Sequence, residues 1–197
     1  SNLINELINE ESNKIFQIMN SYLITSTRNS LLVIDQERAH RRIIYEKLMK
    51  KITKADNSSQ QLIFPVSFVL TKNQKFIYSD LENILIEMGF RLKLEDNFNL
   101  KITGIPEICS DNQSHKILED LFDEFQTDPK NKSFSFADLI AKSISKSSSI
   151  KKGNSLVNEE QKNIINNLFS CKDYLLCPFQ KKIIFSISKS ELQNKFL

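Results

Sequence analysis

The chain has 197 residues, of which 40% are hydrophobic and 26% are charged, and its formal net charge is +3. This composition excludes a disordered tail and indicates a globular protein, long enough for one domain or two small lobes. The charge balance permits contact with a polyanion without requiring it. Because no apolar run approaches the roughly 20 residues that span a bilayer, and the start lacks a signal region, we expect no membrane association.

Cys109, Cys171 and Cys177 are an odd number of cysteines and form no CxxC pair. This pattern disfavours a disulfide framework and indicates a reducing compartment, so we expect a cytoplasmic protein. Three glycines in the whole chain argue against a glycine-rich phosphate loop. Because the sequence begins with Ser1 instead of Met, we also expect a fragment of a longer protein.

Apolar spacing predicts the elements of the first half of the chain. In order, they are a helix at positions 2 to 13, a three-stranded meander from 15 to 34, a helix from 37 to 54, a strand from 61 to 70 interrupted by Pro65, and a helix from 80 to 88 that ends at Gly89. The last strand of the meander, at positions 31 to 34, is continuously apolar, which indicates a strand buried on both faces.

In the second half of the chain, apolar residues again recur at helical spacing in some segments and alternate as in a strand in others. We expect a hairpin from 91 to 103, a helix from 113 to 125, a helix from 135 to 153, a helix capped by Asn158 that continues to 169, a strand from 182 to 188, and a short final helix capped by Ser190. These elements predict an α+β fold without internal repeats.

Polar stretches at positions 55 to 59 and 127 to 132 have the composition of linkers. We therefore expect two lobes. Residues 1–58 plus 145–197 form a discontinuous lobe with a mixed sheet and helices, and residues 59–144 form an inserted, smaller α/β lobe.

Positions 31 to 46 read LLVIDQERAHRRIIYE, a buried strand that ends in Asp-Gln and leads into a helix. This stretch resembles a motif of the MutL C-terminal domain family of DNA mismatch-repair proteins. Further similar segments follow in the order typical of the family: Ser149-Ile150-Lys151 with Gly153, Leu168-Phe169, Cys177-Pro178, and a final Ser-x-x-Glu-Leu helix.

The resemblance implies that the discontinuous lobe is a dimerisation subdomain and the inserted lobe an external regulatory subdomain. It implies a homodimer that joins two ATPase-bearing chains. ATP and Mg are then expected only in an N-terminal domain absent here, with no cofactor in this fragment. The implied partners are a MutS-type mismatch recognition protein, DNA and the sliding clamp, in the bacterial cytoplasm and at the nucleoid during repair.

Endonuclease members of the family carry DQHAxxExxxxE, a Cys before the Ser-Ile-Lys segment, and CPHGRP. Imidazole, thiolate and carboxylate groups ligate zinc or manganese, and residues four apart on a helix project from the same face. In this chain Arg41 replaces the first Glu, and a guanidinium stays protonated and cannot bind a metal. The positions of the degenerate site are Asp35, Glu37 in place of His, Arg41, Glu46, Lys146 in place of Cys, and Cys177.

We therefore expect no catalytic residue and no metal in this domain. Glu37 and Arg41 are spaced to form an i,i+4 ion pair, and we expect Asp35 to cap the following helix. Arg41 and Lys146 are expected to supply the positive charge that a metal would give to Asp35 and Glu37. The alternative is a metal-dependent nicking endonuclease with an atypical site built from Asp35, Glu37, Glu46 and Cys177.

Gln60-Gln61-Leu62-Ile63-Phe64-Pro65 fits Gln-x-x-(Leu or Ile)-x-Pro, which resembles the clamp-binding motif of several family members. The predicted clamp-binding residues are Gln60, Ile63 and Pro65, because an extended segment can bury Ile63 and Pro65 in an apolar groove. The alternative is that this stretch is simply a core strand.

Overall fold

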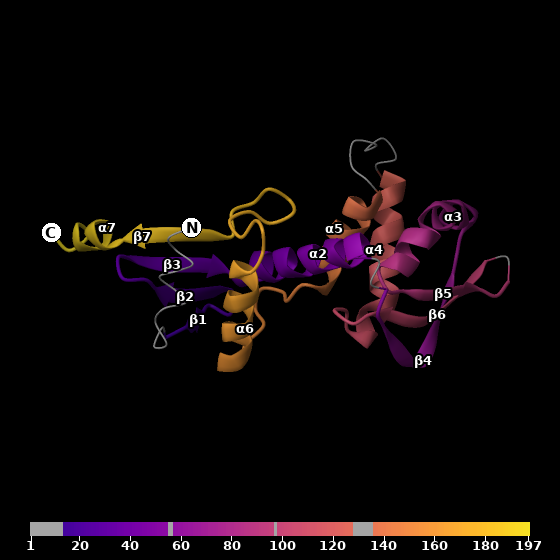
Figure 1. Cartoon of the computed structure of the whole chain (residues 1–197), viewed down its shortest axis with the longest axis horizontal. Coiled ribbons are helices and arrows are strands. Elements are labelled where there is room, and N and C mark those ends of the chain that lie inside the picture. The colour runs from indigo at the N-terminus through magenta and orange to yellow at the C-terminus, as the bar shows by residue number, and fades with distance from the viewer. Residues whose placement is uncertain (1–13, 55–56, 97, 128–135) are drawn as a thin grey trace. The chain divides into compact units, whose positions relative to one another are not determined.

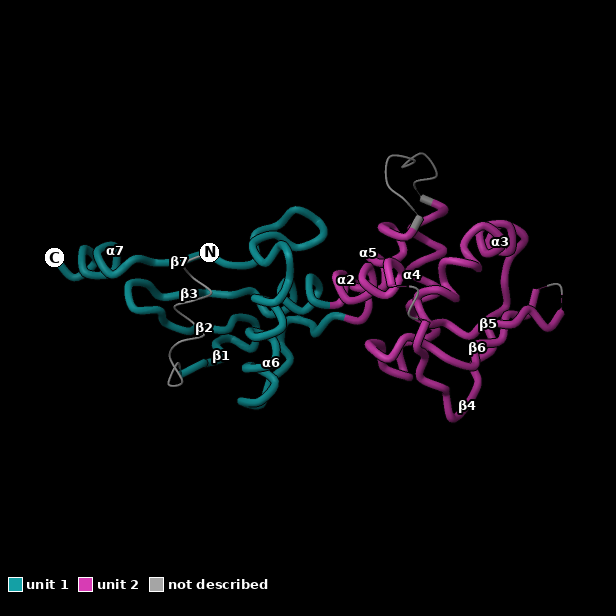
Figure 2. Tube along the Cα trace, viewed as in Figure 1, with its two compact units in different colours: residues 1–43, 149–197 teal, residues 44–148 magenta. Residues whose placement is uncertain are grey.

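The computed structural model describes residues 14–54, 57–96, 98–127 and 136–197. The helix expected at positions 2 to 13 lies outside the described residues, as does most of the stretch from 127 to 132. The chain divides into two compact units, which Figure 2 shows in different colours. Unit 1 comprises residues 1–43 and 149–197, and unit 2 comprises residues 44–148.

Unit 1 contains a four-stranded sheet in the order β1-β2-β3-β7 (Figure 1). The strands are β1 (Phe16–Ile18), β2 (Tyr22–Ser26), β3 (Ser30–Asp35) and β7 (Ile184–Ser188). All three pairings are antiparallel, so the prediction of a mixed sheet, with both parallel and antiparallel strands, is wrong. The reason is that short turns join β1, β2 and β3, while β7 returns beside β3 in the opposite direction.

One face of this sheet is buried. Leu23 and Ile34 are fully buried, and they pack with Ala39 and Ile43 of α2 (Gln36–Lys54) and with apolar residues of α6 (Asn158–Phe169). The other face carries side chains that remain partly or largely exposed, although many of them are apolar.

Helix α2 contributes to both cores, and this explains why the observed units differ from the expected lobes. Ala39 and Ile43 belong to the core of unit 1, whereas Ile44 and Leu48 belong to the core of unit 2. The first boundary therefore falls within the helix, between residues 43 and 44, instead of at the polar stretch after it. The second falls between 148 and 149, where α5 (Phe136–Ser148) ends, instead of between 144 and 145.

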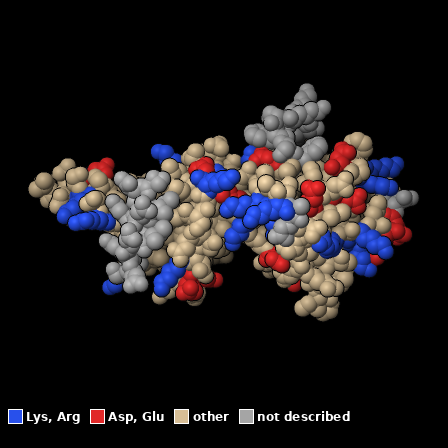
Figure 3. Space-filling view, in the orientation of Figure 1, with Lys and Arg blue, Asp and Glu red and all other residues tan. Residues whose placement is uncertain are grey.

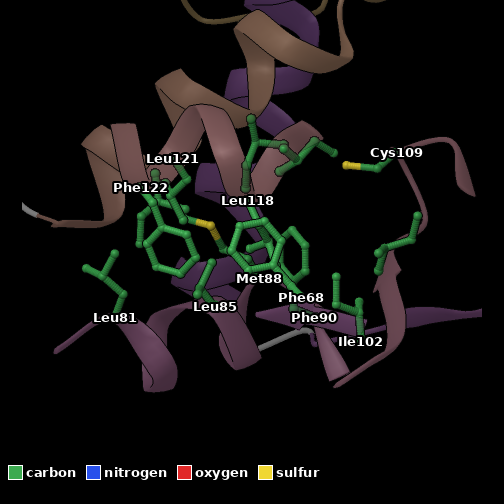
Figure 4. Close-up of a cluster of buried hydrophobic side chains, with 14 of the residues drawn as sticks. Phe68, Leu81, Leu85, Met88, Phe90, Ile102, Cys109, Leu118, Leu121 and Phe122 are labelled. Atoms are coloured by element: carbon green, nitrogen blue, oxygen red, sulfur yellow. The ribbon is translucent and has the colours of Figure 1, made fainter. Parts of the chain in front are cut away.

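Unit 2 combines a three-stranded antiparallel sheet, in the order β4-β6-β5, with helices on one face (Figure 1). Figure 4 shows aromatic and aliphatic side chains from the sheet and from helices α3 and α4 meeting in one apolar core. The elements are β4 (Ser59–Val69), α3 (Lys72–Glu87), β5 (Arg91–Leu94), β6 (Asn99–Pro106), η1 (Asp111–Gln113), α4 (Ser114–Thr127) and α5.

Helix α3 begins about two turns before the position expected from the sequence. Thr71 and Gln74 form a capping box, in which Thr71 Oγ1 accepts from the Gln74 N–H at 3.2 Å and Gln74 Oε1 accepts from the Thr71 N–H at 2.9 Å. The predicted end of this helix at Gly89 is confirmed, since Gly89 has a φ of +102°. A Cβ there would collide with the Ser58 carbonyl oxygen, so glycine is required.

Three other helix ends differ from the sequence prediction. Helix α5 ends at Ser148 instead of continuing to Gly153, and Asn158 is the first residue of α6 instead of its cap. Helix α7 (Lys189–Gln193) is capped by Ser188, whose Oγ accepts from the Glu191 N–H at 3.2 Å, and not by Ser190.

Within the described parts of the chain, no helix is both long and apolar enough to cross a membrane.

Strand β4 contains the irregularity predicted at Pro65. Gln61 pairs with Gly104 and Val66 pairs with Ile102, so four residues of β4 lie opposite a single residue of β6. Of these, Leu62 is 5% exposed and enters the core, whereas Ile63 and Phe64 are 81% and 83% exposed. The bulge therefore projects two large apolar side chains into solvent.

Candidate functional site

Asp35 lies where β3 passes into α2, and its carboxylate is buried at the start of the helix. Its Oδ1 accepts from the Arg38 backbone N–H at 3.0 Å, which confirms the predicted cap. Its Oδ2 lies 3.4 Å from Arg38 Nε and 3.5 Å from Lys152 Nζ. The charge of Asp35 is therefore balanced by side chains of the same unit.

Glu37 and Arg41 form the i,i+4 ion pair predicted from their spacing, with 2.5 Å between Arg41 Nη2 and Glu37 Oε1. Their side chains are only 20% and 16% exposed. The Arg41 guanidinium also lies over the Phe179 ring, 5.3 Å from its centroid. Lys151 Nζ approaches Glu37 Oε1 at 4.0 Å, so two cations face this carboxylate.

The cations beside these acids are only partly those expected. Arg41 pairs with Glu37 as predicted, and Lys151 and Lys152 of the same unit also face these carboxylates. Lys146 lies on α5 in unit 2, where it is one of the charges that lower the pKa of Asp120. Glu46 is buried and also belongs to unit 2, on the second half of α2.

Cys177 is completely buried in the core of unit 1. Its backbone N–H donates to the Lys181 carbonyl at 2.9 Å, and its carbonyl accepts from the Gln180 N–H at 2.9 Å. These bonds close a tight loop in which Gln180 has a φ of +59°, a left-handed conformation that glycine adopts more easily. The glycine of the family pattern CPHGRP corresponds to this position.

Asp35 and Glu37, at the predicted degenerate metal site, are surrounded by cations. Among the residues that the structure describes, no three His, Cys, Asp or Glu side chains come close enough to share a metal. The two carboxylates of unit 1 at the expected position, Asp35 and Glu37, are instead paired with arginine and lysine. Arginine and lysine side chains therefore pair with the carboxylate oxygens that a metal ion would need as ligands.

Gln36 has a structural role that the sequence did not reveal. It is fully buried, and its Nε2 donates to the carbonyls of Asn20 at 3.0 Å and Asn154 at 3.2 Å. Its Oε1 accepts from Gln17 Nε2 at 2.6 Å. These bonds join α2 to the β1–β2 turn and to the segment after α5. Because the partners are distant in sequence, no local pattern could have predicted them.

The predicted clamp-binding residues lie on β4 in unit 2. Ile63 and Pro65 are exposed in the bulge, as described above. Gln60 is also exposed, and its Nε2 donates to Asp111 Oδ1 at 2.8 Å. The exposure of Ile63 and Phe64 contradicts the alternative that the whole stretch enters the core, which only Leu62 does.

A cavity of about 410 Å³ lies against the second half of α2 in unit 2. Lys47, Lys50, Lys51 and Lys54 line it together with Glu107. Figure 3 shows basic side chains gathered over α2. Lys51 donates to the Ser58 carbonyl at 2.9 Å, so part of this charge stabilises the start of β4.

The family model described as the MutL C terminal dimerisation domain matches residues 15–156. A DNA mismatch repair protein MutL of Christiangramia forsetii is 35% identical over 181 residues, which are 92% of this chain and 29% of the relative. The MutL of Flavobacterium psychrophilum is also 35% identical over 181 residues, covering 92% of this chain and 30% of that protein. The MutL of Chlorobaculum tepidum is 30% identical over 192 residues, covering 98% and 31%. The chain thus spans less than a third of the length of these curated relatives.

Proposed function

Because the chain belongs to the family of MutL C terminal dimerisation domains, we propose that it is the homodimerisation module of a DNA mismatch-repair protein. In this role, two copies join the two chains of the repair protein, so that ATPase domains outside this chain are held as a pair. ATP and Mg would act in those domains. Contact with DNA and with a MutS-type recognition protein would involve the full-length protein.

The observation that carries this proposal is the open face of the unit 1 sheet. Phe16 pairs with Ile24, Ile24 with Val33, and Val33 with Phe185, so these four side chains form one row across all four strands. Phe16 and Phe185 are 58% and 54% exposed. A contiguous apolar row on a sheet face is typical of a protein interface, and an obligate dimer buries roughly 2,000 Å² or more.

Sedimentation across a dilution series tests the proposal. The wild-type chain is expected to have a molar mass near twice 22.9 kDa, and the double variant Val33→Asp, Phe185→Asp is expected to be monomeric because two charges enter the interface. Phe76→Asp is the matched control, since Phe76 is 69% exposed but belongs to unit 2. A monomeric wild type, or a double variant that still dimerises, would contradict the proposal.

We propose further that this domain does not nick DNA. The arginine and lysine partners of Asp35 and Glu37 support this, because a divalent cation would have to displace them. The rival is an endonuclease that uses Asp35, Glu37, Glu46 and Cys177. Equilibrium dialysis with Mn²⁺ and Zn²⁺, together with a plasmid nicking assay, separates the two. Stoichiometric metal with nicking that Asp35→Asn abolishes would establish the rival.

A second candidate function is docking to the sliding clamp through the β4 bulge. The favouring observation is that Ile63 and Pro65 of the predicted motif project into solvent. Ile63→Ser is expected to weaken clamp binding at least tenfold, because an apolar anchor is removed from the centre of the contact. Phe64→Ser is the matched control, since Phe64 is equally exposed but lies outside the motif positions. Equal losses in both variants would exclude recognition through the motif.

A further inference from the structure

A cavity of about 210 Å³ opens in unit 1 at the end of the sheet where β3 passes into α2. Its polar rim is formed by Asp35, Arg38, Lys152 and Lys182. Tyr22 and Phe185 contribute aromatic walls. The cavity therefore combines a charged rim with an apolar surface, and one of its charges is the carboxylate that the family resemblance places at a metal centre.

The rim carries three positive charges and one negative charge, which leaves a surplus of two positive charges. The single carboxylate is already neutralised, because Asp35 Oδ2 lies 3.4 Å from Arg38 Nε and 3.5 Å from Lys152 Nζ. A cation brought into this cavity would meet repulsion from two further charges. An anion would be attracted.

Two of the three basic side chains, those of Arg38 and Lys152, are held in place by other contacts. Arg38 Nη1 donates to the Lys182 carbonyl at 2.8 Å, which joins the first turn of α2 to the segment before β7. Lys152 Nζ lies 5.7 Å from the centroid of the Tyr22 ring, so a cation–π contact holds it over the same cavity. Three cations from three separate segments thus converge on one opening, which lowers the entropic cost of binding.

We propose that this cavity is a binding site for a phosphate group. Guanidinium and ammonium groups form charge-assisted hydrogen bonds to phosphate oxygens, and the aromatic walls offer a surface on which a sugar or base attached to the phosphate can pack. Where the family resemblance implies side chains that bind a metal cation, this chain therefore carries mainly positive side chains, which favour an anion. Val33 and Phe185 line this cavity and also belong to the open sheet face proposed for dimerisation, so the phosphate site borders the proposed interface.

Nuclear magnetic resonance with inorganic phosphate as the probe tests the site in the intact chain. Phosphate, compared with chloride at equal ionic strength, is expected to cause saturable amide shifts at residues 35–38, 152–153 and 182–185. The lysine-lined cavity of unit 2 serves as an internal reference, because nonspecific attraction would shift amides at residues 47–54 equally.

Two neighbouring lysines provide a matched pair of variants. Lys182 lines the cavity, whereas Lys181, which is also exposed, does not. Lys182→Gln is expected to weaken phosphate binding about tenfold, the loss of one charge-assisted hydrogen bond, and Lys181→Gln is expected to change it less than twofold. Molar mass is measured for both variants, because Phe185 also belongs to the open sheet face and a change in assembly must be separated from a change in binding.

A short DNA duplex in place of inorganic phosphate distinguishes the source of the phosphate group. If Lys182→Gln weakens duplex binding and Lys181→Gln does not, the ligand is a nucleic-acid backbone. If only inorganic phosphate responds to Lys182→Gln, the ligand is a free phosphate or a phosphorylated small molecule. The proposal is overturned if phosphate causes no saturable shift in this cavity, or if both variants lose binding equally.

Discussion

His40 Nδ1 accepts a hydrogen bond from the backbone N–H of Ile150 at 3.0 Å. The contact joins α2 to the segment that follows α5, and both residues belong to unit 1. Because Nδ1 acts as the acceptor, the imidazole in this arrangement carries its proton on Nε2. The Ser-Ile-Lys segment singled out in the sequence is thereby attached to the helix that carries Glu37 and Arg41.

Replacing His40 with Phe should destabilise unit 1 by about 1 kcal/mol, because the part-buried Ile150 N–H would lose its hydrogen-bond partner. Urea denaturation monitored by circular dichroism measures the change in unfolding free energy. His40→Asn is the control, since its Oδ1 can occupy nearly the same position as Nδ1. If the Phe and Asn variants are equally stable, the hydrogen bond contributes nothing.

The Glu37–Arg41 pair should show a coupling free energy on the order of 1 kcal/mol in a double-mutant cycle. Exposed i,i+4 pairs contribute about 0.3–0.5 kcal/mol, but these side chains are only 20% and 16% exposed. The cycle uses Glu37→Gln, Arg41→Gln and both together, each measured by urea denaturation. A coupling that disappears in high salt would mean that the pair behaves as an exposed one.

Gln180→Gly should stabilise the chain by about 0.5–1 kcal/mol. Gln180 has a φ of +59°, where a side chain costs roughly 1–2 kcal/mol, part of which is offset by the greater freedom of glycine in the unfolded state. The side chain is exposed, so little packing is lost. Thermal unfolding compares this variant with Gln180→Ala, which keeps the strain. A lower melting temperature for the glycine variant than for wild type would refute the expectation.

Asp120 should contribute to stability in a pH-dependent way. Burial acts to raise the pKa of Asp120, but the hydrogen bond from Ser147 at 2.6 Å and the charges of Lys116 and Lys146 outweigh it, so the pKa lies below 3.8. Because the folded-state pKa is lowered, the stabilisation is complete above the unfolded-state pKa and is lost as pH falls through the folded-state pKa.

Asp120→Asn should therefore destabilise the chain at neutral pH, and the difference from wild type should shrink below about pH 4. Urea midpoints at a series of pH values and constant ionic strength measure this. Asp80→Asn, at an exposed carboxylate on α3, is the control. A difference for Asp120→Asn that stays constant with pH would show that it arises from packing instead of charge.

Local patterns predicted local structure well. The strand at positions 31 to 34, the helix after Asp35, and the Glu37–Arg41 pair all depend on residues a few positions apart, and the structure contains each of them. The predicted burial of this strand on both faces is wrong, because Leu31 and Val33 lie on the open face of the sheet and are only partly buried. The early start of α3 also had a local signal, since Thr71 followed three residues later by Gln74 fits a capping box.

Contacts between distant segments could not be predicted in this way. Lys152 lies beside Asp35, and Gln36 bonds to Asn154, only because the chain returns to the same place after passing through unit 2. The sequence identified the segment around Ser149 to Gly153 by resemblance, but it could not indicate which of its lysines faces which carboxylate. The role expected of Lys146 beside Asp35 and Glu37 stays a prediction, because Lys146 belongs to unit 2.

The division of α2 between two cores bears on how the protein unfolds. The helix has 19 residues, and the part that belongs to unit 2 begins at Ile44 and ends at Lys54. Isolated helices shorter than about 12–15 residues are marginal in water, so each part of α2 depends on packing against the core of its own unit. Unfolding of one unit removes the core against which its part of α2 packs and leaves the other unit with a shorter helix. An expression fragment cut at the unit boundary would lose either the Asp35 cap or the last turns of the same helix.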